Sequence, residues 1–130
     1  MRHADIERYC LSLPGATVHT PWGDSRVYKV AGKMFAMLAH DDRGHPSEVW
    51  FKAGEGSFEI LLRQKGIRPC PYLARAKWVA LESPNVLPPN IIKAYLSRAH
   101  WQVVEGLPKK KRMALEAGSD VVKRKIIARR

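Results

Sequence analysis

Apolar residues near the amino terminus recur with the period of a helix. Four of them fall at i, i+3, i+4 and i+7, the spacing of one helical face: Ile6, Tyr9, Cys10 and Leu13. The pattern predicts an amphipathic helix that ends at Pro14-Gly15, because proline and glycine both interrupt helices.

The next apolar runs are short and rich in strand-forming residues. Arg26–Val30 and Met34–Leu38 are separated by Ala31-Gly32-Lys33, so they predict a β-hairpin. The second run is apolar on both faces, which favours a central place in a sheet. Further strands are predicted at Glu48–Lys52 and Lys77–Leu81.

Two more helices complete the pattern. Ser57 can cap a short helix that ends at Gly66, and Pro88-Pro89 suits the first turn of a long one. The apolar face of the long helix comprises Ile92, Tyr95, Leu96, Ala99 and Val103. Ile67–Tyr72 contains two prolines and is predicted to be an extended connector rather than a strand.

The order of elements predicts the fold class. Strands joined by tight turns imply a largely antiparallel sheet, and amphipathic helices need an apolar partner. We therefore expect an α+β fold, a two-layer α/β sandwich with the helices on one face, as a single domain at residues 1–107. Residues 108–130 form a basic C-terminal tail.

The net charge of the chain indicates the kind of partner that it binds. The formal net charge is +11, and residues 108–130 carry nine basic and two acidic residues, which leaves +4 for residues 1–107. Polyanions attract such a chain through counterion release, so nucleic acid, and DNA in particular, is the expected partner. Four of the basic residues are consecutive at the start of the tail: Lys109, Lys110, Lys111 and Arg112.

Other classes of protein are disfavoured. The chain opens on charged residues and contains no apolar run of about 18 residues, so we expect no membrane segment and a cytoplasmic location. Cys10 and Cys70 match no zinc or redox spacing and are predicted to be reduced core thiols. Without a phosphate-binding loop, dinucleotide fingerprint or nucleophile elbow, we expect no enzyme and no cofactor.

A series of short motifs resembles the MmcQ/YjbR family over about residues 3–112. The opening signature comprises Leu13–Ala16, Pro21–Gly23 and Val27–Ala36, and the later blocks are Phe51-Lys52 with Phe58–Leu62, Arg68–Leu73 with Lys77–Val79, and Leu107–Lys110. The resemblance implies a frataxin-like (CyaY-like) sandwich, a "double-wing" DNA-binding motif and a non-enzymatic role. The chain departs from the family pattern where Asn-Lys-x-His-Trp becomes Arg75-Ala76-Lys77-Trp78.

Strand alternation suggests which residues could bind DNA. It places Trp50, Lys52 and Trp78 on the face away from the helices, where indole rings could stack on bases; the alternative is that both rings pack in the interior. Further cations near turns could contact phosphates or simply be solvated: Lys29, Lys33, Arg68, Arg75 and Lys77.

The tail has two interpretations besides DNA contact. Val121, Val122, Ile126 and Ile127 could form a helix that docks its apolar side on the body or on a partner. Disorder is instead predicted for Lys109–Arg112 and for Ala117–Ser119, which have no apolar face.

Two rival functions remain open beside a DNA-binding module of low sequence specificity. The first is a protein-interaction adaptor whose basic tail tunes solubility. The second is a metal-handling protein, but Asp5 and Glu7 are too few acids for iron, and the His40–His45 segment is more typical of a hairpin turn. We therefore predict no metal site.

Overall fold

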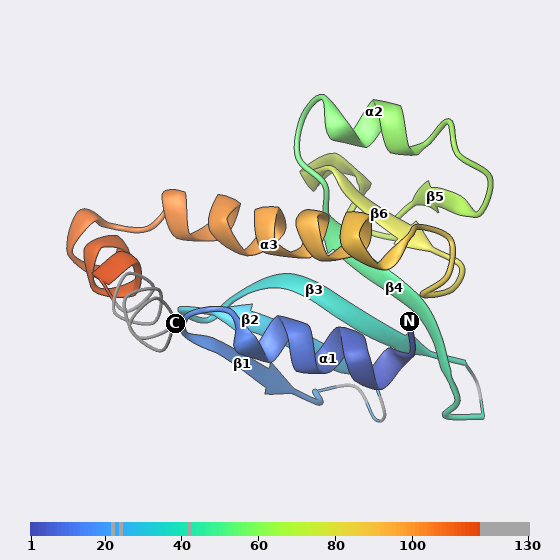
Figure 1. The fold of residues 1–130 in the computed structure, drawn as a ribbon, viewed down its shortest axis with the longest axis horizontal. Coiled ribbons are helices and arrows are strands. Elements are labelled where there is room, and N and C mark those ends of the chain that lie inside the picture. Colours follow the sequence, from blue (N-terminus) through green and yellow to red (C-terminus); the bar gives the residue numbers. More distant parts are fainter. Residues whose placement is uncertain (22, 24, 42, 118–130) are drawn as a thin grey trace, which may run out of the picture.

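A computed structural model describes residues 1–21, 23, 25–41 and 43–117 of the chain. One antiparallel sheet of six strands has the order β1-β2-β3-β4-β6-β5 (Figure 1). The strands are β1 (Ala16–His19), β2 (Arg26–Val30), β3 (Lys33–His40), β4 (Pro46–Lys52), β5 (Ile67–Pro69) and β6 (Trp78–Leu81). The helices are α1 (His3–Ser12), α2 (Ser57–Leu61), the short 3-10 helix η1 (Ala74–Ala76) and α3 (Pro89–Glu105).

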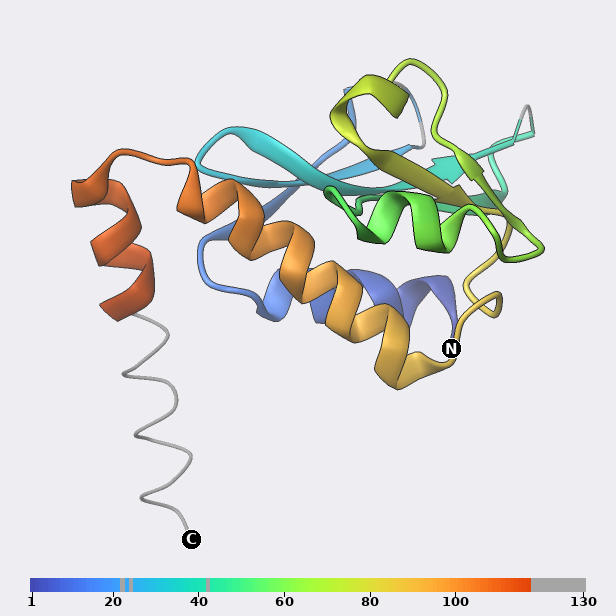
Figure 2. The same cartoon turned by 90° about the horizontal axis from the view of Figure 1, so that it is seen from above.

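The helices α1, α2 and α3 cover one face of the sheet, whereas the segment that contains η1 lies over the other (Figure 2). The α+β class, the antiparallel sheet and the helical layer that the sequence predicts are thus confirmed. The main core lies between the sheet and the helices, and its largest fully buried side chains include Tyr28, Phe35, Phe51, Ile6, Leu61, Leu81, Ile92 and Leu96.

The predicted hairpin and the central place of its second strand are both confirmed. Five consecutive residues of β3, Phe35–Ala39, are buried, which is what an apolar run with both faces covered requires. A register shift between Tyr28 and Lys29 places Ala36 opposite Tyr28 and Met34 opposite Lys29. The bulge keeps Phe35 and Ala36 in the helix-covered core and leaves Met34 on the other face.

Two strands were not predicted from the sequence, β1 and β5, and both lie at the edges of the sheet. β1 has four residues, and β5 has only three, in a segment predicted to be a connector. Pro69 lacks an N–H, which an edge strand can tolerate because one side of the strand has no partner. The prolines indicated correctly that the segment is not central, but they did not exclude pairing with β6.

The beginning of the basic tail is helical. Residues 109–117 form a helix, where the sequence analysis predicted disorder for Lys109–Arg112. The reason is Leu115, which packs against the main core beside Gly15; a Cβ at Gly15 would come within 2.5 Å of the Leu115 side chain. The predicted docking through Val121, Val122, Ile126 and Ile127 lies outside the described residues.

His100 is the one fully buried histidine among the described residues, and it anchors α3 to the end of α1. Its Nε2 donates a hydrogen bond to the Pro14 carbonyl oxygen at 2.7 Å, and its ring lies edge-on to Phe35 and Trp101. Nδ1 is buried without a partner among the described residues. Burial lowers the pKa of His100 because it disfavours the charged imidazolium.

This lowered pKa predicts a loss of stability in mild acid. Below about pH 6.5 the unfolded chain gains a proton at His100 that the folded protein resists, so the free energy of unfolding should fall as pH decreases from there, by at most about 1.4 kcal/mol per pH unit. His100→Gln keeps a donor for Pro14 and should flatten this dependence in urea titrations at several pH values. Replacing the exposed His45 with Gln is the control; an unchanged slope in His100→Gln would refute the assignment.

Candidate nucleic-acid interface

Strand alternation gives the sheet a second, open face opposite the three helices (Figure 2). Two small apolar clusters lie on it, one built from Val27, Met37 and Ala39 and the other from Cys70, Trp78 and Ala80, with Met34 and Trp50 packing against both. This alternation confirms the predicted separation of Trp50 and Trp78 from Val49, Phe51, Val79 and Leu81, which lie in the helix-covered core.

A groove of about 420 Å³ opens between these clusters and the segment before β6. Its walls are almost wholly apolar: Ser25, Met34, Met37, Trp50, Pro71, Tyr72, Leu73 and Trp78. Its volume falls within the range of about 300–1,000 Å³ that small-molecule sites occupy. The groove is therefore large enough to hold a flat organic group.

A tight turn forms one wall of the groove. The Leu73 N–H donates to the Cys70 carbonyl at 3.2 Å, which closes a four-residue turn with Pro71 in its second position. Tyr72, in the third position, has φ +65°, the left-handed value that a type II turn requires there and that favours glycine. The Tyr72 side chain is fully exposed.

The two tryptophans differ in their exposure. Trp78 is only 4% exposed and belongs to the interior of the open-face cluster, so its proposed role in stacking is wrong. Trp50 is half-buried on the groove wall. Its Nε1 donates to Glu48 at 3.0 Å, and the Arg68 guanidinium binds both oxygens of that carboxylate at 2.7 and 2.9 Å, so this ion pair fixes the indole ring.

Only some of the basic residues predicted to contact phosphates lie near the groove. Lys29 lies opposite Met34 on the neighbouring strand, and Lys52 lies opposite Trp78. Because Met34 and Trp78 line the groove, these two lysines flank it. Arg75 is exposed in η1 nearby. Arg68 is engaged by Glu48, and Lys77 turns toward the helical layer, where its Nζ lies 5.0 Å from the centre of the Phe58 ring. Those two residues are poorly placed for phosphate contact.

The remaining cations lie at one end of the molecule. Both views place the helix of residues 109–117 at the end of the molecule where β2 turns into β3 (Figures 1 and 2). Lys33, the first residue of β3, is exposed. Lys109, Lys110 and Lys111 are exposed, whereas Arg112 is half-buried and faces Glu116 at 4.0 Å. Three of the four predicted tail cations therefore project freely into solvent.

Comparison with known proteins identifies the family. A family model described as YjbR matches residues 11–102. The chain belongs to the YjbR family. A Deinococcus radiodurans protein, DR2400, with family-model domain DUF419, has a similar structure with TM-score 0.75 and 22% identity over 88% of each chain. A Pseudomonas syringae protein matches with TM-score 0.66 and 15% identity over 78% of this chain and 98% of its own. No curated protein matches the chain.

The YjbR match covers the groove but not the helix that carries the lysine cluster. Residues 11–102 include every residue of the groove wall, from Ser25 to Trp78, whereas Lys109–Lys111 lie beyond the matched part. The two parts of the interface can therefore be tested separately, one as a property of the YjbR domain and the other as a property of this chain.

Tyr72 is not among the site residues predicted from the sequence, although it lies within a motif of the family resemblance. The sequence predicts an extended connector there, and an aromatic residue in a connector gives no signal of its own. The available signal was Pro71, since proline in the second position of a turn makes the next residue a candidate for positive φ. A large aromatic residue at that position, instead of glycine, is the feature that could have been noticed.

The described residues contain no group of three or more metal-capable side chains. Asp41 Oδ1 accepts hydrogen bonds from the backbone N–H groups of Arg43 and His45, both at 2.9 Å, so the turn interpretation of this segment is supported. No helix among the described residues is long and apolar enough to cross a membrane.

Proposed function

We propose that this YjbR protein is a non-enzymatic DNA-binding module of low sequence specificity. The observation that carries the proposal is the charge around the open face and the adjoining end of the molecule. Seven exposed or half-exposed cations there make no ion pair among the described residues: Lys29, Lys33, Lys52, Arg75, Lys109, Lys110 and Lys111. Glu48, which accepts a hydrogen bond from the groove residue Trp50, is already neutralised by Arg68.

The arrangement favours backbone contact over base reading. Lysines bind phosphates as point charges, and contacts to phosphate position a protein on DNA without reading its sequence. The β2–β3 turn is followed by Lys33, and the η1 segment with Arg75 lies over the sheet face opposite the three helices (Figure 2); these are the elements that would act as wings. Low specificity follows because such cations outnumber groups able to read base edges.

Charge reversal on the open face tests the proposal. Lys29→Glu and Lys52→Glu should each weaken duplex binding at least about eightfold at 0.1 M salt, and should flatten the dependence of log K on log salt by about 0.9. The measurement is fluorescence anisotropy with a labelled duplex at several salt concentrations.

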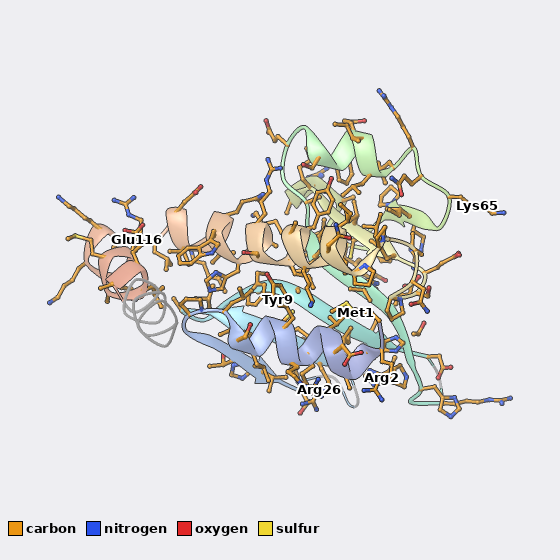
Figure 3. All side chains as sticks on the ribbon, in the orientation of Figure 1. Met1, Arg2, Tyr9, Arg26, Lys65 and Glu116 are labelled. Carbon is orange, nitrogen blue, oxygen red and sulfur yellow. The ribbon has the colours of Figure 1, made fainter. Side chains whose placement is uncertain are left out.

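Lys65→Glu is the matched control for these variants. Lys65 is exposed in the loop between α2 and β5 and points away from the body of the protein (Figure 3), so the same charge reversal there should change affinity far less. If all three variants bind equally, the open face is not the site. If the unmodified protein binds no nucleic acid at low salt, the proposal fails.

The groove favours one alternative, an adaptor that binds a protein. Met34 and Met37 are flexible and polarizable, and methionine is common on surfaces that accommodate varied peptides. An adaptor requires no affinity for nucleic acid, so the same anisotropy experiment separates the two functions.

We also infer a reducing, cytoplasmic setting. Cys10 and Cys70 are buried on opposite faces of the sheet and form no disulfide, and burial raises the pKa of each thiol to about 12. Such thiols stay protonated and unreactive. They are consistent with core packing in a reducing compartment and not with redox chemistry.

A further inference from the structure

Tyr72 has no structural reason to be a tyrosine. Its φ of +65° is uncommon for any residue other than glycine, and for a bulky side chain it is a source of strain. Its ring is fully exposed, so it contributes no burial to the core that could offset the strain. Glycine would satisfy the turn better, and nothing in the fold explains the exposed ring.

Tyr72 stands at the edge of the apolar groove. Tyr72 and the half-buried Trp50 both line it, together with Met34, Met37 and Leu73. Two aromatic side chains that border an open apolar slot suit a flat ring system, which gains from stacking and from removal of its faces from water. The ligand should thus contain a planar, weakly polar group.

The groove's surroundings select a negatively charged ligand. Lys29 and Lys52 flank it through their pairing with Met34 and Trp78, and Arg75 lies three residues beyond Tyr72. The carboxylate that contacts Trp50, Glu48, is held by Arg68. A chain of phosphates that carries planar groups matches both features, whereas a neutral apolar peptide matches only the groove.

We propose that the groove between β3, β4 and the Cys70–Lys77 segment holds an unpaired base of single-stranded DNA, with Tyr72 stacked on it and Lys29 and Lys52 on the flanking phosphates. Bases of an intact duplex are stacked on each other and cannot enter. The polar side-chain groups of the groove walls are the Ser25 and Tyr72 hydroxyls and the indole N–H groups of Trp50 and Trp78, and the Trp50 N–H already donates to Glu48. This small set requires no 2′-hydroxyl on the ligand, so DNA satisfies the site. This inference rests on the proposed function. It adds that the bound DNA is single-stranded and that Tyr72 contacts an unpaired base.

The test compares Tyr72→Gly with Tyr72→Phe in the full chain. Tyr72→Gly should fold with unchanged or higher melting temperature, because it removes strain and no packing. Its affinity for a labelled oligothymidylate should fall about 5- to 150-fold, which corresponds to the loss of one stacking contact. Its affinity for a duplex should stay the same. Tyr72→Phe keeps the ring and should bind as the unmodified protein does.

Two further measurements sharpen the result. Ile60→Ala removes an exposed apolar side chain from α2, on the other side of the sheet, and should leave both affinities unchanged. Oligothymidylate should quench tryptophan fluorescence less in Trp50→Phe than in the unmodified protein, because Trp50 lines the groove.

The outcomes separate this inference from the proposed function. Equal binding of the oligothymidylate by Tyr72→Gly and the unmodified protein overturns the inference while duplex binding still supports the proposed function. Parallel loss of both affinities overturns it as well, since stacking acts on unpaired bases alone. A random copolymer of glutamate and tyrosine that competes as well as the oligothymidylate would assign the groove to an acidic peptide. Absence of all nucleic-acid binding would remove both proposals.

Discussion

Replacing Lys109, Lys110 and Lys111 with serine should weaken duplex-DNA binding by about two to three orders of magnitude at 0.1 M salt. These side chains are exposed on the helix of residues 109–117 and form no ion pair among the described residues. Each phosphate contact contributes about 0.9 to the slope of log K against log salt, so the slope should flatten by about 2.7. Anisotropy titrations from low to moderate salt measure both quantities.

A second triple variant tests whether the position of the three lysines matters or only the net charge. Replacing Lys123, Arg124 and Lys125 with serine removes the same charge from the part of the chain that the structure does not describe. If the two triple variants lose affinity equally, net charge alone attracts DNA and the docked helix has no special role. If the change at residues 109–111 leaves the salt slope unaltered, those lysines do not touch phosphates.

Trp78→Ala should give the largest loss of stability among the open-face variants. The side chain is 4% exposed and packs with Cys70 and Ala80, and truncating a buried tryptophan typically lowers the free energy of unfolding by about 3–5 kcal/mol. For a domain of this size the melting temperature should fall by about 10–20 °C. Calorimetry or circular dichroism measures the change directly.

Trp78→Phe is the conservative comparison, because it refills most of the space and should restore most of the stability. Trp50→Ala should be milder than Trp78→Ala, since Trp50 is only half-buried. A Trp78→Ala protein as stable as the unmodified one would mean that the ring is not part of the folded interior. Its binding should be measured only at temperatures where the variant is folded.

The sequence predicted those parts of the fold that depend on long apolar patterns. The helical spacing of Ile92, Leu96 and Val103 and the apolar run of β3 were sufficient, because α3 buries one regular face and β3 buries five consecutive residues. β1 and β5 were missed because edge strands are short and half-exposed, so their patterns resemble those of loops. The helix at residues 109–117 packs on the body through Leu115, which lies beside Gly15, and local patterns cannot show such a distant contact.

The sequence predicted which residue types form the candidate site, but not which of them are buried or paired. Alternation assigned Trp50 and Trp78 to the correct face of the sheet, but it could not show that Trp78 lies beneath the Cys70–Lys77 segment. The same limit applies to Arg68, whose partner Glu48 is twenty residues away in sequence. Whether a cation is free or paired depends on such tertiary contacts, whereas its presence is plain from the sequence.

The contact between Leu115 and Gly15 also has a thermodynamic consequence for ligand binding. A disordered lysine cluster must lose backbone and side-chain freedom when it meets DNA, and that loss subtracts from its affinity. Here the backbone of residues 109–117 is already ordered by folding, because glycine at position 15 leaves the space that Leu115 fills. The lysines should thus bind with most of the backbone entropy already lost. A residue without a side chain, far away in the sequence, thereby contributes to affinity without approaching the ligand.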